Sequence, residues 1–174
     1  LFLLGEENLK KIFFQSIRKG EMAIVEGVMG LFDGLGIESC ASTAHVAKIL
    51  KLPVILVVNV RSMSTSAAAL VHGFQTYDPE VQLVGVICNQ TSSKTHFSQV
   101  KESIERDCKL PVVGHLPFKK FLDLPERHLG LVPGWEITHL EKWLDHCADF
   151  FLKNVNLNQI IDLMIPLEEY SITP

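Results

Sequence analysis

The sequence predicts an α/β fold in which a parallel sheet carries helices on both faces. Short, almost unbroken apolar runs alternate along the chain with longer segments whose apolar residues recur at helical spacing. Runs without polar alternation are typical of strands that are buried on both sides, as parallel strands usually are. The 174 residues, 47% hydrophobic and 21% charged, have the composition of one globular domain with a sizeable core.

The N-terminal part is expected to form a helix, a strand and a second helix. Residues 5–19 show apolar residues at helical spacing and end at a lysine–glycine pair. The apolar run 23–28 contains β-branched residues and predicts a buried strand. A helix is then expected from Ser42 or Thr43 to Lys51.

The middle of the chain repeats a regular strand–helix alternation, which predicts right-handed crossovers between parallel strands. The sheet is expected to contain at least four strands. After them come an irregular loop, two more helices and a terminal linker. The expected strands are 53–60, 83–89 and 111–117, the helices 66–77, 96–109, 136–154 and 156–164, the loop 118–135 and the linker 166–174.

Charge, hydropathy and cysteine usage exclude several classes. The net charge is −4 and no block of five like charges occurs, so a nucleic-acid partner is not expected. The longest apolar run, 52–60, is far below the ~20 residues of a bilayer span, so no membrane partner is expected. The four cysteines form no CxxC pair, which favours free thiols in a cytoplasmic protein. The chain begins at Leu1 and is expected to be a piece of a longer one.

A glycine-rich acidic segment, EGVMGLFDG, follows the first predicted strand at residues 26–34. Its glycines allow a positive φ and the close approach of a ligand. Glu26 and Asp33 are two carboxylates that a metal or a reacting group could share, and Mg²⁺ takes one or two carboxylates together with phosphate oxygens. The alternative is a surface turn with solvated acids. The functional interpretation is favoured because an acid at the end of a buried strand is costly without a partner.

Other polar residues follow the later strands. Ser42 and Thr43 begin a helix, where a hydroxyl residue acts as a cap and exposed N–H groups also bind anions. Asn89 ends a predicted strand; its amide suits the edge of a nucleobase, although asparagine at a strand end is also a turn former. No glycine is followed by lysine, so the sequence lacks the phosphate-binding loop GxxxxGK[ST].

Four segments together resemble the amidoligase domain of the cobyrinate a,c-diamide synthase family, and the similarity extends from Leu1 to about Met164. The segments are EGVMGLFDG (26–34), STAHVAKILKLPVILVVNV (42–60), SAAALVHGFQTYDPEVQLVGVICNQ (66–90) and LPERHLGLVPGWE (124–136). The resemblance implies a P-loop NTPase-like fold, similar to dethiobiotin synthetase. It also implies an ATP- and Mg²⁺-dependent glutamine amidotransferase of cobalamin biosynthesis. Such an enzyme amidates the a and c acetate side chains of cobyrinate through an acyl phosphate.

The resemblance also implies roles for single residues. Glu26 would be the Mg²⁺ ligand, and Glu26 and Asp33 would be the catalytic pair, with Asp33 at the reacting carboxylate. Asn89 and Pro117 would border the adenine of ATP. The tetrapyrrole substrate would contact Gly30, Leu31, Phe32, Ser42 and Thr43.

The chain departs from the family pattern in three respects. The phosphate loop expected upstream and the glutaminase domain expected downstream, which releases the ammonia, are not in this sequence, and Asn59 stands where the family usually has aspartate. Residues 1–135 are therefore expected to be a partial amidoligase domain, 136–165 its C-terminal helices and 166–174 the linker to the glutaminase domain. Such a fragment is expected to be inactive alone.

Three points stay open at the level of sequence. The substrate of the same chemistry could be another tetrapyrrole, hydrogenobyrinate or nickel-sirohydrochlorin. The oligomeric state is open as well, and a homodimer is one option. A non-catalytic α/β binding module is the alternative from a different class, suggested by the missing phosphate loop and by Asn59.

Overall fold

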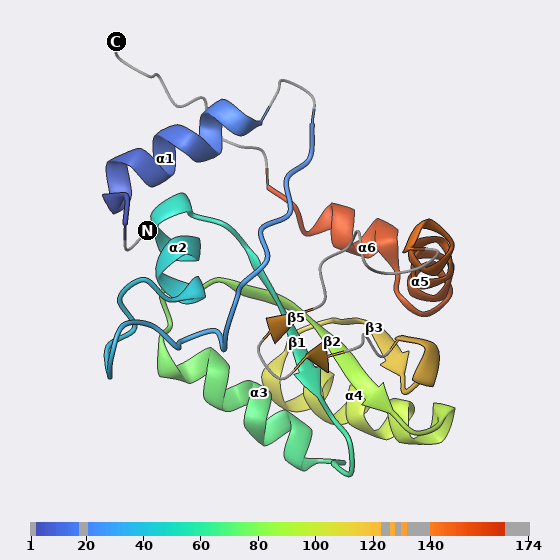
Figure 1. Cartoon of the computed structure of the whole chain (residues 1–174). Coiled ribbons are helices and arrows are strands. Elements are labelled where there is room, and N and C mark those ends of the chain that lie inside the picture. The colour runs from blue at the N-terminus through green and yellow to red at the C-terminus, as the bar shows by residue number, and fades with distance from the viewer. Residues whose placement is uncertain (1–2, 18–20, 123–125, 128–129, 132–139, 166–174) are drawn as a thin grey trace. The chain divides into compact units, whose positions relative to one another are not determined.

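The computed structural model describes residues 3–17, 21–122, 126–127, 130–131 and 140–165 (Figure 1). Two compact units are found in the chain, and each is described by itself. The first comprises residues 1–54, 78–82 and 164–174, and the second comprises residues 55–77 and 83–163.

The second unit is built on a three-stranded sheet with the strand order β1-β2-β3. β2 and β3 pair in parallel, with Val86 opposite Val112. The Val54 N–H donates to the Gln82 carbonyl and the Val60 N–H to the Asn89 carbonyl, so β1 and β2 also advance in the same direction. The parallel sheet predicted from the apolar runs is confirmed. Its strands are β1 (Val54–Asn59), β2 (Leu83–Thr91) and β3 (Val112–Pro117).

One face of the sheet is covered by α3 (Ser66–Tyr77) and α4 (Lys94–Cys108), which pack against each other. Helix α4 also contacts β2 and β3. The α4 residues Val100 and Ile104 are fully buried. The Cys108 thiol donates to the Ala68 carbonyl of α3 over 3.3 Å, and burial raises its pKa.

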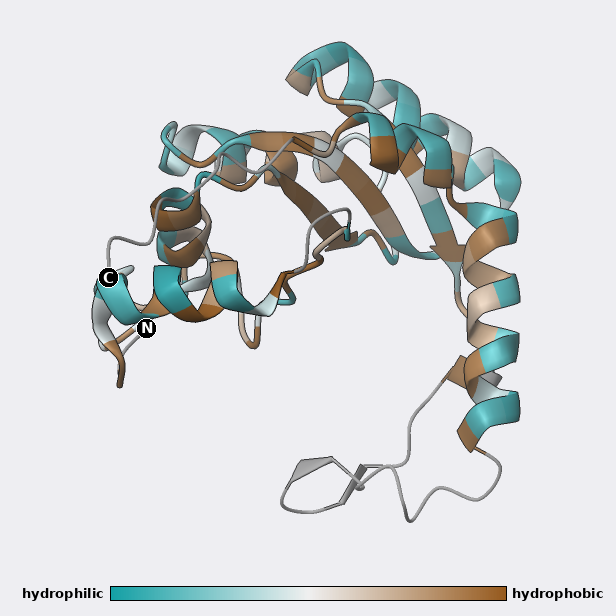
Figure 2. Cartoon of the chain, turned by 90° about the horizontal axis from the view of Figure 1, so that it is seen from above, coloured by the Kyte–Doolittle hydropathy of each residue, from teal (hydrophilic) through white to brown (hydrophobic). Residues whose placement is uncertain are grey.

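The other face is covered by α5 (Leu140–Asn154) and α6 (Leu157–Asp162), which both contact β3. Since successive residues of a strand point to opposite faces, a strand with neighbouring buried residues needs cover on both sides. In Figure 2 the strands are accordingly among the most hydrophobic segments. The predicted α/β class with helices on both faces is confirmed. The cluster on this face contains Ile87, Val113 and Val155, with Ile55, Leu116, Phe151, Ile160 and Leu163 against it.

The outer edge of β3 is closed by the short segment between α5 and α6. Val155 forms an antiparallel bridge to Gly114, and the Asn156 N–H donates to the Val113 carbonyl over 2.8 Å. A Cβ atom at Gly114 would lie 2.7 Å from the Val155 Cα, so a side chain there would force the two backbones apart. Glycine at this position is therefore a requirement of the close approach.

The first unit contains α1 (Gly5–Ser16) and α2 (Thr43–Leu50), which contact each other, and the irregular segment between them. Three residues of α2 are buried: Ala44, Ala47 and Leu50. The helix ends at Leu50, and the left-handed conformation of the following Lys51 lets its N–H bond to carbonyls of the last turn. Both helices were expected, and α1 ends three residues before the predicted boundary.

The strand predicted at 23–28 is wrong. This segment is irregular, with Ile24 and Val28 91% and 97% exposed. A strand needs a neighbour that completes its backbone hydrogen bonds, and no described strand pairs with this segment. Its β-branched composition indicates strand propensity but does not supply the partner. The sheet consequently has three described strands rather than the expected four or more.

The loop predicted at 118–135 contains short regular elements that the sequence reading missed. The turn η1 (Lys120–Leu122) follows β3, and β4 (Glu126–Arg127) pairs antiparallel with β5 (Gly130–Leu131). Two-residue strands carry no recognisable alternation, which is why the hydropathy pattern did not reveal them. The predicted helix 136–154 is seen from Leu140, since 132–139 lie outside the described residues, and so does the predicted linker 166–174.

All four cysteines are free, as their spacing predicted. Cys40 is exposed, Cys147 is half-buried, and Cys88 and Cys108 are buried. Burial raises the pKa of Cys88 to about 12, so this thiol stays protonated at neutral pH. No described helix is long and apolar enough to cross a membrane.

The buried contact of α4 with the sheet gives a stability prediction. Ile104→Ala, at a residue with no exposure, is expected to lower the free energy of unfolding by about 2–5 kcal/mol, because it removes buried methyl groups and leaves a cavity. Ile37→Ala is the matched control, since Ile37 is fully exposed, and its effect should stay within about 0.5 kcal/mol. Urea unfolding of both variants measures the difference, and equal losses would contradict this packing.

Candidate functional site

The first group of predicted site residues lies in the loop before α2, within the first unit. The Asp33 N–H donates to the Gly30 carbonyl over 3.0 Å, which closes a turn. The Ala44 N–H donates to the Leu31 carbonyl over 2.8 Å, and Leu31 is buried. These contacts attach the loop to the first turn of α2, so residues 30–33 lie beside the start of that helix.

The glycines of this loop serve close contacts within the chain. The three glycines, Gly27, Gly30 and Gly34, do not use the positive φ that glycine allows. A side chain at Gly27 would overlap that of Thr43, and a side chain at Gly30 would overlap the Asp33 carboxylate. The structure therefore brings Gly27 next to Thr43 and Gly30 next to Asp33, and the absence of a side chain is what permits both contacts.

The two carboxylates of the loop, Glu26 and Asp33, are exposed. Glu26 follows an irregular segment rather than a buried strand, so the desolvation argument that favoured a functional role does not apply to it. The described residues contain no group of three or more histidine, cysteine, aspartate or glutamate side chains that could hold a metal. Mg²⁺ commonly takes one or two carboxylates and completes its shell with water and phosphate oxygens, so a single carboxylate fits it when a nucleotide supplies the rest.

Ser42 is the N-cap of α2. Its hydroxyl accepts the His45 N–H over 3.1 Å and is 1% exposed, as the capping interpretation expects. Thr43 is half-buried and lies next to Gly27. Of Ser42 and Thr43, both predicted to contact the substrate, Thr43 therefore has the more accessible side chain.

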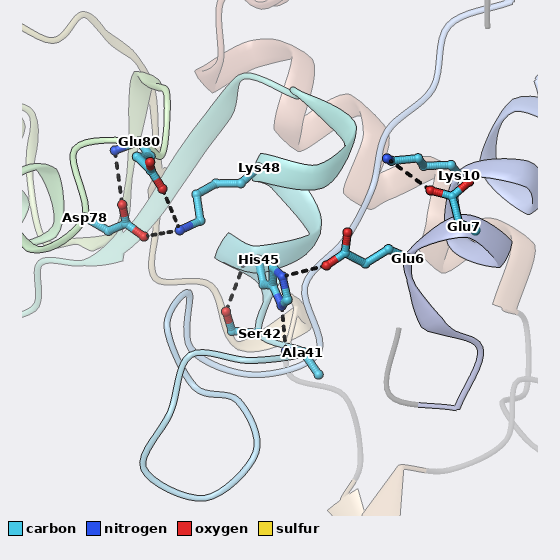
Figure 3. A network of polar contacts seen from close by, with 9 residues as sticks. All are labelled: Glu6, Glu7, Lys10, Ala41, Ser42, His45, Lys48, Asp78 and Glu80. Atoms are coloured by element: carbon cyan, nitrogen blue, oxygen red, sulfur yellow. Dashed lines mark hydrogen bonds and ion pairs between the residues drawn. The ribbon is translucent and has the colours of Figure 1, made fainter. Parts of the chain in front are cut away.

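An ion-pair network that sequence analysis missed holds α2 to the turn before β2 (Figure 3). The Lys48 ammonium lies 2.7 Å from the Asp78 carboxylate and 3.2 Å from that of Glu80. The hydrogen bond from Lys48 lowers the pKa of Asp78, and the same bond raises the pKa of Lys48. The network thus stabilises the fold around α2.

A shallow hollow lies beside this network and contains no predicted site residue. It is lined by Ala47, Lys48, Lys51, Leu52, Glu80 and Gln82.

The second group, Asn89 and Pro117, lies in the second unit on neighbouring strands. β2 continues to Thr91, two residues beyond the predicted end, and the register places Thr91 opposite Pro117. The Asn89 side-chain oxygen accepts the Gln90 N–H over 2.8 Å. Its amide nitrogen has no acceptor among the described residues. Asn89 therefore offers a hydrogen-bond donor at the carboxyl end of the sheet.

Next to this group lies a histidine that the sequence reading did not single out. His115 of β3 stacks on Phe97 with ring centroids 3.9 Å apart, and its Nδ1 lies 2.9 Å from the hydroxyl of the buried Thr91. Burial, with a smaller contribution from the charge of Lys94, lowers the pKa of His115. The available signal was its position: His115 directly follows the buried residues 112–114 of the same strand.

The two groups belong to different units. Within the predicted loop 118–135, Glu126 and Arg127 form β4, and His128 lies outside the described residues.

A family model described as "AAA domain" matches residues 5–126. The chain belongs to the AAA domain family. The match includes every residue predicted for the site, from Glu26 to Pro117, and it accords with the predicted P-loop NTPase-like class. No solved structure matches the chain significantly.

Several curated relatives of this AAA domain chain are named cobyrinate a,c-diamide synthase. The protein of Caldanaerobacter subterraneus subsp. tengcongensis is 42% identical over 95% of this chain and 36% of its own length. The Listeria innocua protein is 44% identical over 98% and 38%. The Salmonella typhimurium protein is 40% identical over 94% and 36%. The resemblance inferred from the motifs is confirmed, and the chain spans little more than a third of these relatives.

The environment of His115 predicts a pH dependence of stability. Because the folded state favours the neutral ring, the unfolded chain binds a proton first as the pH falls. The free energy of unfolding should therefore decrease from about pH 6.5 downward and level off below the pKa of the folded state. His115→Gln should remove part of this slope, whereas His72→Gln, at an exposed histidine, should not. Urea unfolding between pH 7 and pH 5 measures it, and equal slopes in all three proteins would contradict the assignment.

Proposed function

We propose that the chain is part of an ATP-dependent amidotransferase that converts the a and c acetate side chains of cobyrinate to amides in cobalamin biosynthesis. The observation that carries the proposal is 40–44% identity to three cobyrinate a,c-diamide synthases over at least 94% of this chain. The free cysteines support a cytoplasmic location. Because the chain spans 36–38% of those relatives, the complete reaction requires further segments.

The proposed chemistry has two steps. A substrate carboxylate oxygen attacks the γ-phosphorus of ATP, which forms an acyl phosphate and releases ADP. Ammonia released from glutamine then attacks the acyl carbon, loses a proton and displaces inorganic phosphate, which leaves the amide. A Mg²⁺ ion bound with the nucleotide supplies charge neutralisation on the phosphates.

In the first unit, Glu26 is the proposed Mg²⁺ ligand and Asp33 the residue at the reacting carboxylate. Both side chains are exposed, which supports these roles because a ligand can reach either carboxylate. The segment Gly30–Leu31–Phe32 and the helix start at Ser42 and Thr43 are proposed to contact the tetrapyrrole. The hydrogen bond from Ala44 to Leu31 joins the segment 30–32 to the helix start, which supports one continuous binding surface formed by the two.

In the second unit, Asn89 and Pro117 are proposed to border the adenine ring. The available donor on the Asn89 amide supports this, because the ring nitrogens of adenine are acceptors. Pro117 presents a side chain without polar atoms on the neighbouring strand, which suits the face of a purine.

The phosphate loop and the ammonia source are proposed to come from segments outside this sequence. No glycine here is followed by lysine. The strand order places β1 at an edge of the sheet, and Val57 on β1 is 57% exposed, which supports a further segment packing there. The chain alone is expected to show no amidation.

A non-catalytic binding module is the second candidate function. One observation favours it: Asn59, which stands where the resembling family usually has aspartate, uses its side-chain oxygen to accept the Arg61 N–H over 3.0 Å. The residue thus stabilises a turn and offers no carboxylate. Amidation by the longer protein would exclude this alternative.

The metal assignment is tested by Glu26→Gln in the longer protein. Loss of the carboxylate charge should reduce Mg²⁺-dependent ATP turnover by roughly two orders of magnitude, because several kcal/mol of charge stabilisation are removed. Folding should be unchanged, since Glu26 is exposed. Glu38→Gln, at an exposed glutamate of the same unit, is the control. Turnover equal to that of the parent protein would contradict the assignment.

The adenine assignment is tested by Asn89→Ala. Loss of one neutral hydrogen bond should weaken ATP binding by roughly threefold to tenfold. GTP, whose purine edge presents different groups, should be affected less. Calorimetric titration with both nucleotides measures the ratio of their affinities. If the ratio is the same before and after the change, Asn89 does not contact adenine.

A further inference from the structure

The start of α2 contains a histidine that folds back over its own helix. The Ser42 hydroxyl accepts the His45 N–H, and the His45 Nδ1 accepts the N–H of Ala41, each over 3.1 Å (Figure 3). One pair of side chains thereby satisfies two backbone donors. The arrangement is a variant of the capping box in which the imidazole replaces glutamate and accepts from the residue before the N-cap. Ala41, whose φ is +62°, is the residue that the ring holds.

The start of α4 repeats this arrangement in the second unit. The Ser93 hydroxyl accepts the His96 N–H, and the His96 Nδ1 accepts the Ser92 N–H, again each over 3.1 Å. Both helices begin with the sequence S-x-x-H, so the same local chemistry occurs twice. Sequence analysis recognised a serine or threonine cap at α2 but not the part played by the histidine.

The hydrogen bonds define which nitrogen carries the proton. Because Nδ1 accepts from a backbone N–H in both rings, a neutral ring must carry its proton on Nε2. The His96 Nε2 then donates to the Met63 carbonyl over 2.6 Å. The His45 Nε2 lies 3.6 Å from the Glu6 carboxylate. Each ring therefore contacts its own helix start through Nδ1 and a different element, α1 or the loop after β1, through Nε2.

Both serine–histidine arrangements hold backbone that lies close to proposed site residues. The loop containing residues 30–33 leads into Ala41, and the Ser42 N–H donates to the Ser39 carbonyl just before it. Asn89 lies within β2, three residues before Ser92, which is the first residue after the strand. Loss of either contact would release the backbone at Ala41 or Ser92, which adjoins the segments that carry these side chains.

We propose that His45 and His96 are positioning residues that hold the loops before α2 and α4 through their Nδ1 atoms. His45 orients the loop for the tetrapyrrole, and His96 orients the strand end for the nucleotide. The identity of these ligands rests on the proposed function, whereas the holding of the loops does not.

Two substitutions separate the contacts of each ring. Asparagine has its side-chain oxygen at the same number of bonds from Cβ as Nδ1, so His45→Asn and His96→Asn keep the acceptor and lose the Nε2 contact. His45→Leu and His96→Leu keep the bulk and lose both. His72→Leu, at an exposed histidine of α3, is the matched control.

The first measurement is made on the chain itself. Nitrogen-15 spectra should show His45 and His96 with the proton on Nε2. Hydrogen exchange of the Ala41 and Ser92 amides should accelerate about threefold to tenfold in the respective leucine variants and stay near the parent rate in the asparagine variants and in His72→Leu. A proton on Nδ1, or exchange unchanged by leucine, would overturn the proposal. Urea unfolding confirms that each variant is folded at the conditions of exchange.

The second measurement is made on the longer protein. His45→Leu should raise KM for the tetrapyrrole and His96→Leu KM for ATP, each about threefold to tenfold with kcat little changed, and asparagine should restore both. Unaltered KM values in an active leucine variant would overturn the positioning role. If the unsubstituted longer protein shows no amidation, the proposed function fails, and the exchange rates and nitrogen spectra alone decide whether the rings hold the loops.

Discussion

The burial of β2 on both faces is the constraint on which the rest of the second unit depends. Val86 and Ile87 are neighbours that point to opposite faces, and both are buried. Helices α3 and α4 cover one face of the sheet and α5 and α6 the other, so these four helices are arranged around one central strand. Rigidity at this strand extends to its carboxyl end, where Asn89 and Thr91 lie next to β3.

The first unit is stabilised in another way, by polar contacts that converge on α2. Lys48 connects the last turns of the helix to Asp78 and Glu80, while His45 at its first turn faces α1. The loop with Gly30 and Asp33 attaches to the same first turn. A short helix with three buried residues thus serves as the common support of this unit, and the proposed substrate loop depends on it.

Features that depend on local sequence or on burial were predicted correctly, whereas features that depend on contacts between distant residues were missed. The strands 54–59, 83–91 and 112–117 were predictable because two-sided burial gives apolar runs, and Ser42 because caps have a local signature. The segment 23–28 failed because strand formation needs a partner that propensity does not reveal. The rings of His45 and His115 were missed because their roles come from contacts that no periodicity records. Site residues from Glu26 to Pro117 were suggested by resemblance, and their chemistry stays a prediction.

Because Val155 and Asn156 contact β3, the two edges of the sheet differ in how readily they can pair with a further strand. A chain that approaches from that side meets a carbonyl already engaged by Asn156 and a glycine already in contact with backbone. Unwanted association of exposed sheet edges is a recognised route to aggregation. At Val113 and Gly114 the edge of β3 is thus occupied, whereas no described strand lies on the outer side of β1. Gly114, which permits this close contact, thereby protects part of the β3 edge from pairing with another chain.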